Sequence, residues 1–549
     1  MFIKRTRSVQ GDREYGAVLL VQGERVPARR GPGRPRADAP ARSRVVHRTL
    51  ANLSKLPEAL VTLIERYCQA EREGKAFDLT EAHEPVIGPA YGPLAALLAL
   101  AREAGIERAL GTTRRGRLAL FLVLARVLHR GSRRSAARWA STQATAPVLG
   151  LERLDEDDLY AALDWLAAEQ PRIERALGPK RPKGLVFLYD VTSSYLEGQH
   201  NELAAPGYNR DGKRFKKQVV VGLLTDAEGE PLSVHVYEGN RADPTTVADV
   251  VHTLAQEFGG AEVVLVGDRG MLRGPAREQL GAQGFRYVTA LTDPELRRHL
   301  REGILRLEDF TEQVAEVVGE GGLRYVFKRI AATRERHRTR RADQLARVQA
   351  KVDQRNAYVA AHPRAEAAVS VRQAERWLGA YKLGAFVSAT LEGRRVVLAV
   401  DAAKQARVHE LDGCYVVLSD VPAAKASAQT LWERYGDLQR VERDFRTLKT
   451  GLLELRPIFL RKAGRTRGHA LVALLALKLT RALERHVKPL GITVAEALDR
   501  LDGVRLVSLG APEHGLWRLP TRWEAPQRDL LAVLPTLPAP MLSLGEPSA

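Results

Sequence analysis

Two apolar segments that each end in an aspartate decide the fold: GLVFLYD (residues 184–190) and AEVVLVGD (residues 261–268). Continuous runs of this kind are typical of strands buried inside a sheet. Between them lie two further strand patterns, KQVVVGLLTD and PLSVHVYEG, and the helical pattern PTTVADVVHTLAQEF. The helical PAREQLGAQG and the strand FRYVTAL follow. The predicted order is β-β-β-α-β-α-β, which indicates an α/β core built on a mixed sheet.

The two aspartates, Asp190 and Asp268, are each the first charged residue after an apolar strand. If the two strands are parallel neighbours, both carboxylates emerge at the edge where open α/β sheets place their sites. Two bare carboxylates there would repel each other unless a cation lay between them. The alternative is that each is an ordinary turn-forming acid at a strand end.

A third acid comes from the helical segment YGDLQRVERDFRTLK, which we expect to belong to one long helix. Glu442, Arg446 and Lys449 lie at positions i, i+4 and i+7, on one helix face. Such a carboxylate could bind a metal while the cations hold phosphate. The alternative is a simple Glu442–Arg446 ion pair, worth roughly 0.2–0.5 kcal/mol. Rival acids on the same segment are Glu433, Asp437, Asp444 and Glu454.

Three carboxylates that meet in space suit one chemistry in particular. Cutting or joining a phosphodiester in line is helped by two divalent cations, one at the attacking and one at the leaving oxygen. Mg²⁺ prefers hard oxygen ligands such as carboxylates. The charge of the chain, 85 − 66 = +19, points to a polyanionic partner as well.

Length and composition narrow the possible classes of protein. A chain of 549 residues predicts two to four domains. No apolar run reaches the roughly 18 residues of a membrane-spanning helix, and residues 118–128 and 470–477 are instead expected to be buried helices. The N-terminus has no signal-peptide pattern, and Cys68 and Cys414 are the only cysteines, so we expect a cytosolic protein without disulfides.

Four blocks in this order resemble the bacterial insertion-sequence DDE transposases: VFLYDVTSSYLEG, GNRADPTT, LVGDRGM and YGDLQRVERDFRTLKTGLLELRPIF. The resemblance covers roughly residues 184–485. It is to the group with a β-rich insertion domain before the glutamate and a Tyr-Arg-Glu-Lys signature around it. It implies a ribonuclease-H-like core in which Asp190, Asp268 and Glu442 are the catalytic, metal-binding residues.

The signature matches in part. Tyr435 fits its tyrosine and Lys449 its lysine, whereas Leu438 stands where the family has arginine. Arg440 or Arg446 are the candidates to replace that arginine. In relatives the signature contacts DNA near the cut end, so the resemblance implies DNA contacts for these residues: Tyr435, Arg440, Arg446 and Lys449.

The resemblance also implies an activity. The chain would bind the terminal inverted repeats of its insertion sequence, cleave the ends and transfer 3′-hydroxyls to target DNA. It would use two Mg²⁺ ions, for which Mn²⁺ could substitute, act as a homodimer in the synaptic complex, and work at the bacterial nucleoid. The alternatives are a ribonuclease-H-fold nuclease that cuts without transfer and an inactive DNA-binding remnant.

An arginine-rich loop, ARRGPGRPRADAPARSR (residues 28–44), resembles an AT-hook through Arg30, Arg34 and Arg36. Extended arginine-rich strands fit the narrow minor groove of A·T tracts. A basic solvated linker is the alternative. We expect the region up to about residue 180 to recognise the DNA ends.

The expected organisation has six parts. They are basic strands with the AT-hook-like loop (1–54), a helical DNA-binding region (55–180), the first part of the core (181–295), the insertion domain (296–428), the second part of the core with the glutamate helix (429–490), and a C-terminal segment with a Pro-rich tail (491–549).

Overall fold

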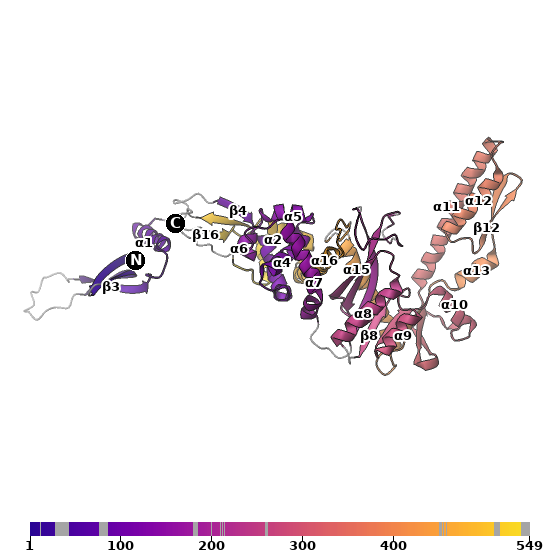
Figure 1. Ribbon diagram of the computed structural model, residues 1–549, viewed down its shortest axis with the longest axis horizontal. Helices are drawn as coiled ribbons and strands as arrows, with labels where there is room; N and C mark the ends of the chain where they lie inside the picture. The colour runs from indigo at the N-terminus through magenta and orange to yellow at the C-terminus, as the bar shows by residue number, and fades with distance from the viewer. Residues whose placement is uncertain are drawn as a thin grey trace, which may run out of the picture. The chain divides into compact units, whose positions relative to one another are not determined.

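The computed structural model of the chain divides into two compact units, which we describe separately (Figure 1). One contains residues 1–100, 137–154 and 486–549, and the other contains residues 101–136 and 155–485. Boundaries between the units fall within α2 (Gly92–Glu103), α5 (Arg133–Ala140) and α16 (Ala463–Val487). The structure describes all residues except 11–12, 28–42, 76–85, 179–184, 199, 209, 211, 214, 259–261, 450–452, 454, 457, 510–516 and 540–549.

The first unit holds two small antiparallel sheets. One comprises β1 (Phe2–Gln10), β2 (Arg13–Pro27) and β3 (Ser43–Asn52), with α1 (Glu58–Glu73) next in the chain. The other pairs β15 (Arg505–Leu509) with β4 (Val86–Ala90) on one side and β16 (Trp517–Pro520) on the other. The unit also contains α6 (Thr145–Leu149), α17 (Val494–Asp502) and α18 (Ala525–Val533). The C-terminal segment thus pairs with residues more than four hundred positions earlier, which no local pattern could indicate. The loop with Arg30, Arg34 and Arg36 lies outside the described residues.

The second unit is built on an eight-stranded mixed sheet in the order β10-β11-β14-β9-β8-β5-β6-β7. Only β5–β8 and β8–β9 pair in parallel. The predicted order β-β-β-α-β-α-β is confirmed, from β5 to β9. The strands are β5 (Leu185–Tyr195), β6 (Gln218–Asp226), β7 (Pro231–Glu238), β8 (Val263–Gly267), β9 (Arg286–Ala290), β10 (Ala315–Val318), β11 (Arg324–Arg329) and β14 (Cys414–Ser419).

Helices bury this sheet. Side chains of α8 (Asp243–Phe258), α9 (Gly274–Ala282) and α10 (Asp293–Arg301) share one apolar core with its strands. The apolar runs at 118–128 and 470–477 form buried parts of α4 (Arg114–Leu128) and α16 (Ala463–Val487), as predicted. No helix in the described ranges is long and apolar enough to span a membrane. The remaining helices of the unit include α3 (Ile106–Leu110), α7 (Glu156–Leu177), α14 (Ala428–Gly436) and α15 (Leu438–Lys449).

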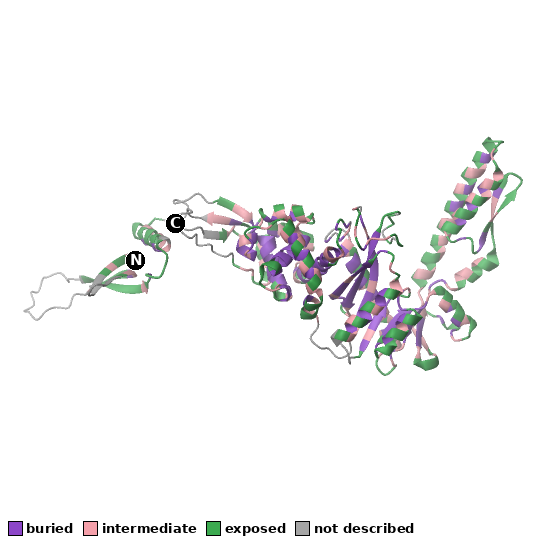
Figure 2. Ribbon diagram, viewed as in Figure 1, coloured by how far each residue is buried: buried purple, intermediate pink, exposed green. Residues whose placement is uncertain are grey.

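Between β11 and β14 the chain leaves the main sheet and forms α11 (Ala331–Ala361), α12 (Ala367–Ala380), the hairpin β12 (Val387–Glu392) with β13 (Arg395–Val400), and α13 (Ala402–Glu410). These elements have a small core of their own, whereas α11 is otherwise largely exposed (Figure 2). The segment differs from the β-rich insertion expected at 296–428. Its strands β10, β11 and β14 extend the main sheet, and helices make up most of the rest.

Two local expectations are corrected. Asp190 lies inside β5 rather than at its end, because β6 pairs with that strand as far as Tyr195. The predicted long helix is broken at Asp437 into α14 and α15, so Tyr435 and Glu442 lie on different helices.

One close approach between helices tests this packing. A Cβ on Gly468 of α16 would collide with the backbone carbonyl of Leu163 in α7, whereas a Cβ on Gly281 of α9 meets nothing. We expect Gly468→Ala to lower the free energy of unfolding by roughly 1–3 kcal/mol through overpacking. The matched Gly281→Ala should be neutral or stabilising by up to about 1 kcal/mol. Urea unfolding of both variants checks this, and equal stabilities would contradict the packing of α7 on α16.

Candidate active site

Asp190 and Asp268 are brought level by the parallel pairing of β5 with β8. Tyr189 lies opposite Gly267 in the register of these strands, so the next residue on each strand is an aspartate. Asp190 is half-buried and Asp268 is exposed just beyond the end of β8. The predicted meeting of two acids at neighbouring parallel strands is therefore present in the fold.

Glu442 joins them from α15. That helix packs against β5 through an apolar face that includes Val441, Phe445 and Leu448, and Glu442 itself is exposed. Burial, and to a smaller extent the negative charges of Asp268 and Glu442, raise the pKa of Asp190 to about 7. The structure thus places Asp268 and Glu442 within electrostatic reach of Asp190.

Two groups oppose this rise in the pKa of Asp190. The backbone N–H of Val191 donates a 2.7 Å hydrogen bond to Asp190 Oδ1, and the positive charge of Arg210 also favours the carboxylate. Arg210 is fixed in turn by its backbone N–H, which donates to Ser193 Oγ at 2.9 Å, and by an ion pair with Asp243. Arg210 was not among the residues predicted from the sequence. Its signal was the run of cations in NRDGKRFKK, between two core strands.

The donor chemistry of the three acids fits a hard divalent cation. Within the described residues, no three His, Cys, Asp or Glu side chains are close enough to chelate one ion together. Two ions that share these carboxylates do not require all three on a single ion. Asp190, Asp268 and Glu442 are the residues that could hold such ions, and a positive charge would offset the burial and the repulsion that raise the pKa of Asp190.

A tyrosine pair extends from Asp268. The Tyr435 hydroxyl donates to Asp268 Oδ1 at 3.2 Å, and the Tyr415 hydroxyl donates to the Tyr435 oxygen at 3.3 Å. Burial and the neighbouring Tyr415 and Asp268 raise the pKa of Tyr435, so it remains a protonated donor. Tyr435, predicted to contact DNA, is thus turned towards the acids.

The other residues assigned to the Tyr-Arg-Glu-Lys signature lie in different places. Leu438 is buried at the start of α15, with 8% of its surface exposed. Arg440 lies on the far side of the helix from Glu442, where it binds Asp437 at 3.2 Å and donates to the Ala227 carbonyl at 2.6 Å. Arg446 is exposed on the helix that carries Glu442, and Lys449 is its last residue.

The rival acids occupy other places. Asp444 is buried and forms a 2.6 Å ion pair with Arg481, and burial nevertheless raises its pKa to about 6. Glu433 accepts a hydrogen bond from Gln429, and Asp437 pairs with Arg434 and Arg440. Glu454 lies outside the described residues.

A cleft of about 400 Å³ lies beside the acids. The residues that line this cleft come from the loop before β6 and from the segments that follow β7 and Asp268. Cations dominate the charged part of this lining, which suits a phosphate backbone. The charged residues are Arg210, Arg241, Asp243 and Arg273.

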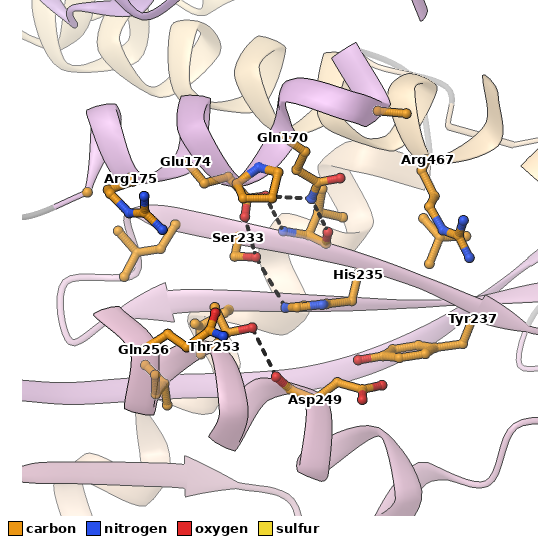
Figure 3. Close-up of a pocket in the computed structure, with 18 of the residues that line it drawn as sticks. Gln170, Glu174, Arg175, Ser233, His235, Tyr237, Asp249, Thr253, Gln256 and Arg467 are labelled. Carbon is orange, nitrogen blue, oxygen red and sulfur yellow. Dashed lines mark hydrogen bonds between the residues drawn. The ribbon is translucent and has the colours of Figure 1, made fainter. Parts of the chain in front are cut away.

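A second pocket, of about 470 Å³, lies at the edge strand β7, beside α7 and α8 (Figure 3). Ser233 Oγ donates to Glu174 Oε2 at 2.8 Å and lies 3.2 Å from His235 Nε2. Burial lowers the pKa of His235 to about 4, so its imidazole is neutral. Strand pairing puts His235 on the Tyr189 face of the sheet, opposite the face that carries Asp190.

The raised pKa of Asp190 predicts a pH effect on stability. Because folding raises its pKa from about 3.9 to about 7, the metal-free fold is penalised progressively as pH rises through that interval. At pH 8 with a chelator, Asp190→Asn should therefore be more stable than the wild type by on the order of 2 kcal/mol, with no gain at pH 4. Thermal unfolding of both proteins at the two pH values measures this. An Asp190→Asn protein that is no more stable at pH 8 would contradict the electrostatic strain.

The lowered pKa of His235 predicts the opposite pH dependence, in which stability falls as pH falls. Its folded pKa of about 4 lies below the unfolded value of about 6.5, so its stabilising contribution is complete above pH 6.5 and is lost as pH falls towards 4. His235→Gln removes this titration. The stability advantage of the wild type over the variant should shrink by up to about 3 kcal/mol between pH 7 and pH 4. A constant advantage across this range would show that His235 is not buried in its neutral form.

Comparison with known proteins identifies a family for this chain. The family described as "Transposase DDE domain" matches residues 181–479, more than half of the chain. Among solved structures, a cryo-EM structure of a piggyBac transposase synaptic complex with hairpin DNA matches at 10% identity and a TM-score of 0.37, over 70% of this chain and 69% of that chain, which is too distant to support an inference. Comparison with curated proteins gives no match. The family match confirms the resemblance seen in the sequence: the chain belongs to the DDE transposase family.

Proposed function

We propose that this transposase binds the terminal inverted repeats of its insertion sequence, cleaves the DNA ends and transfers the freed 3′-hydroxyls to target DNA. Family membership implies metal-dependent cleavage and transfer of DNA in general. The observation that carries the proposal is the register of β5 and β8, which sets Asp190 level with Asp268, with Glu442 close enough to raise the pKa of Asp190.

Asp190, Asp268 and Glu442 are the proposed ligands of two Mg²⁺ ions, for which Mn²⁺ can substitute. Such a pair of ions, when bound, supplies activation of the attacking oxygen and stabilisation of the leaving oxygen. The protein's own part is to fix the carboxylates. The Val191 N–H holds one oxygen of Asp190 and the Tyr435 hydroxyl holds one oxygen of Asp268, which leaves the second oxygen of each for a cation.

DNA would approach the acids over positive charge. Arg446 and Lys449 share α15 with Glu442, and Arg210 and Arg273 line the neighbouring cleft. In this proposal the eight-stranded sheet is a ribonuclease-H-like core and residues 331–410 are the main part of its insertion domain. The region up to residue 180, including Arg30, Arg34 and Arg36, recognises the DNA ends. Two copies act together in the synaptic complex at the bacterial nucleoid.

Cleavage of the element's own ends tests the proposal. Linear DNA that carries the gene's flanking segments is incubated with Mg²⁺ and the wild type, Asp268→Asn, Glu442→Gln or the control Glu433→Gln. We expect cuts at the repeat boundaries from the wild type and the control. Loss of a metal ligand costs several kcal/mol of transition-state stabilisation, so the first two variants should cut at least roughly 100-fold more slowly.

Each other outcome has a distinct meaning. Cutting by Glu442→Gln at the wild-type rate would reject Glu442 as the third acid. Binding of the ends without cutting, in Mg²⁺ and in Mn²⁺, would favour a DNA-binding remnant. Cuts without joining of the ends to added target DNA would favour a nuclease that lacks strand transfer.

A further inference from the structure

A packed aromatic cluster lies where the chain leaves the sheet for residues 331–410 and returns to it. Lys328 near the end of β11 and Tyr415 near the start of β14 lie directly opposite each other in the sheet. The Lys328 ammonium lies 4.9 Å from the ring centroid of Trp432 on α14. The Tyr415 ring packs edge-on against Trp432 at 6.0 Å and tilted against Tyr435 at 5.8 Å.

The hydroxyls of this cluster form a chain with one direction. Tyr415 donates to the Tyr435 oxygen, and Tyr435 donates to Asp268 Oδ1. A phenol has a single proton, so Tyr435 can donate to one acceptor only. When Tyr415 occupies a lone pair of the Tyr435 oxygen, the Tyr435 proton stays directed at Asp268.

Asp268 has need of such a restraint. It is exposed and follows the last residue of β8, outside the hydrogen-bonded ladder. An exposed carboxylate loses rotamer freedom when it binds a cation, and a hydrogen bond that fixes it beforehand reduces that loss. The chain of hydroxyl groups binds Asp268 through Oδ1 and leaves Oδ2 to face a cation.

We propose that Tyr415 is a positioning residue that acts through Tyr435 to hold Asp268 in its cation-binding orientation. This rests on the proposed role of Asp268 as a metal ligand. Tyr415 lies where the polypeptide returns to the sheet after residues 331–410. The chain of hydroxyl groups therefore also joins that segment to the proposed metal site. Both hydrogen bonds are long for O–H···O bonds and can shorten when a cation draws Asp268 into place.

The test removes hydroxyls and keeps rings. Mn²⁺ binding to the full-length protein without DNA is measured by calorimetry for the wild type, Tyr415→Phe, Tyr435→Phe and the double variant. The matched control is Tyr325→Phe. Tyr325 is buried on β11 and packs against His299, 5.1 Å between ring centroids, outside the chain. Circular dichroism sets the temperature so that all variants are folded.

Residues behind metal ligands typically change metal affinity by 10–100-fold. We expect Tyr435→Phe to weaken Mn²⁺ binding about 10-fold and Tyr415→Phe about 3-fold, with the double variant equal to Tyr435→Phe alone. Tyr325→Phe should bind like the wild type. The Mg²⁺ concentration for half-maximal cleavage should shift in the same order.

Two results would overturn the proposal. Wild-type Mn²⁺ affinity in Tyr415→Phe would show that its hydroxyl only fills space. Effects that multiply in the double variant would show that Tyr415 does not act through Tyr435. Failure of the proposed role of Asp268 as a metal ligand is distinguishable, because Asp268→Asn would then bind Mn²⁺ like the wild type.

Discussion

The structure of the candidate site depends on the parallel pairing of β5 with β8. That register places Asp190 beside Asp268 independently of the loop conformations, because the two aspartates directly follow the paired residues Tyr189 and Gly267. The buried apolar residues of both strands fix it, because a slip by one residue would exchange the side chains that pack on the two covered faces of the sheet. Helix α15 lies on β5 and brings Glu442 within electrostatic reach of Asp190.

This arrangement stores electrostatic strain. Burial and two neighbouring carboxylates work against the ionised form of Asp190, and one backbone N–H and Arg210 only partly offset them. Strain of this kind is common at functional sites, where a bound cation or substrate supplies the missing charge. The buried Asp444 differs from Asp190, because its Oδ1 forms a 2.6 Å ion pair with Arg481 inside the protein.

The sequence predicted what depends on local pattern and missed what depends on distant pairing. Apolar runs ending in Asp190 and Asp268 predicted two strands, and helical spacing placed Glu442, Arg446 and Lys449 on one face. The strand was expected to end at Asp190, yet the polar residues Thr192, Ser193 and Ser194 that follow it are buried because β6 pairs alongside them. The pairing of β9 with β14 spans more than a hundred residues, so nothing local placed β14 in the main sheet. Arg440 was separable from Glu442 by helical spacing alone, since two residues rotate a helix by about 200°.

The most direct test of the central claim is the position of bound Mn²⁺. Anomalous diffraction from crystals of the protein grown with Mn²⁺ locates the ion without reference to activity. The account predicts an anomalous peak at about 2.2 Å from carboxylate oxygens of Asp190 and Asp268, with Glu442 at the same peak or at a second one about 4 Å away. A peak held by other residues, or none at Asp190 and Asp268 at saturating Mn²⁺, would contradict it.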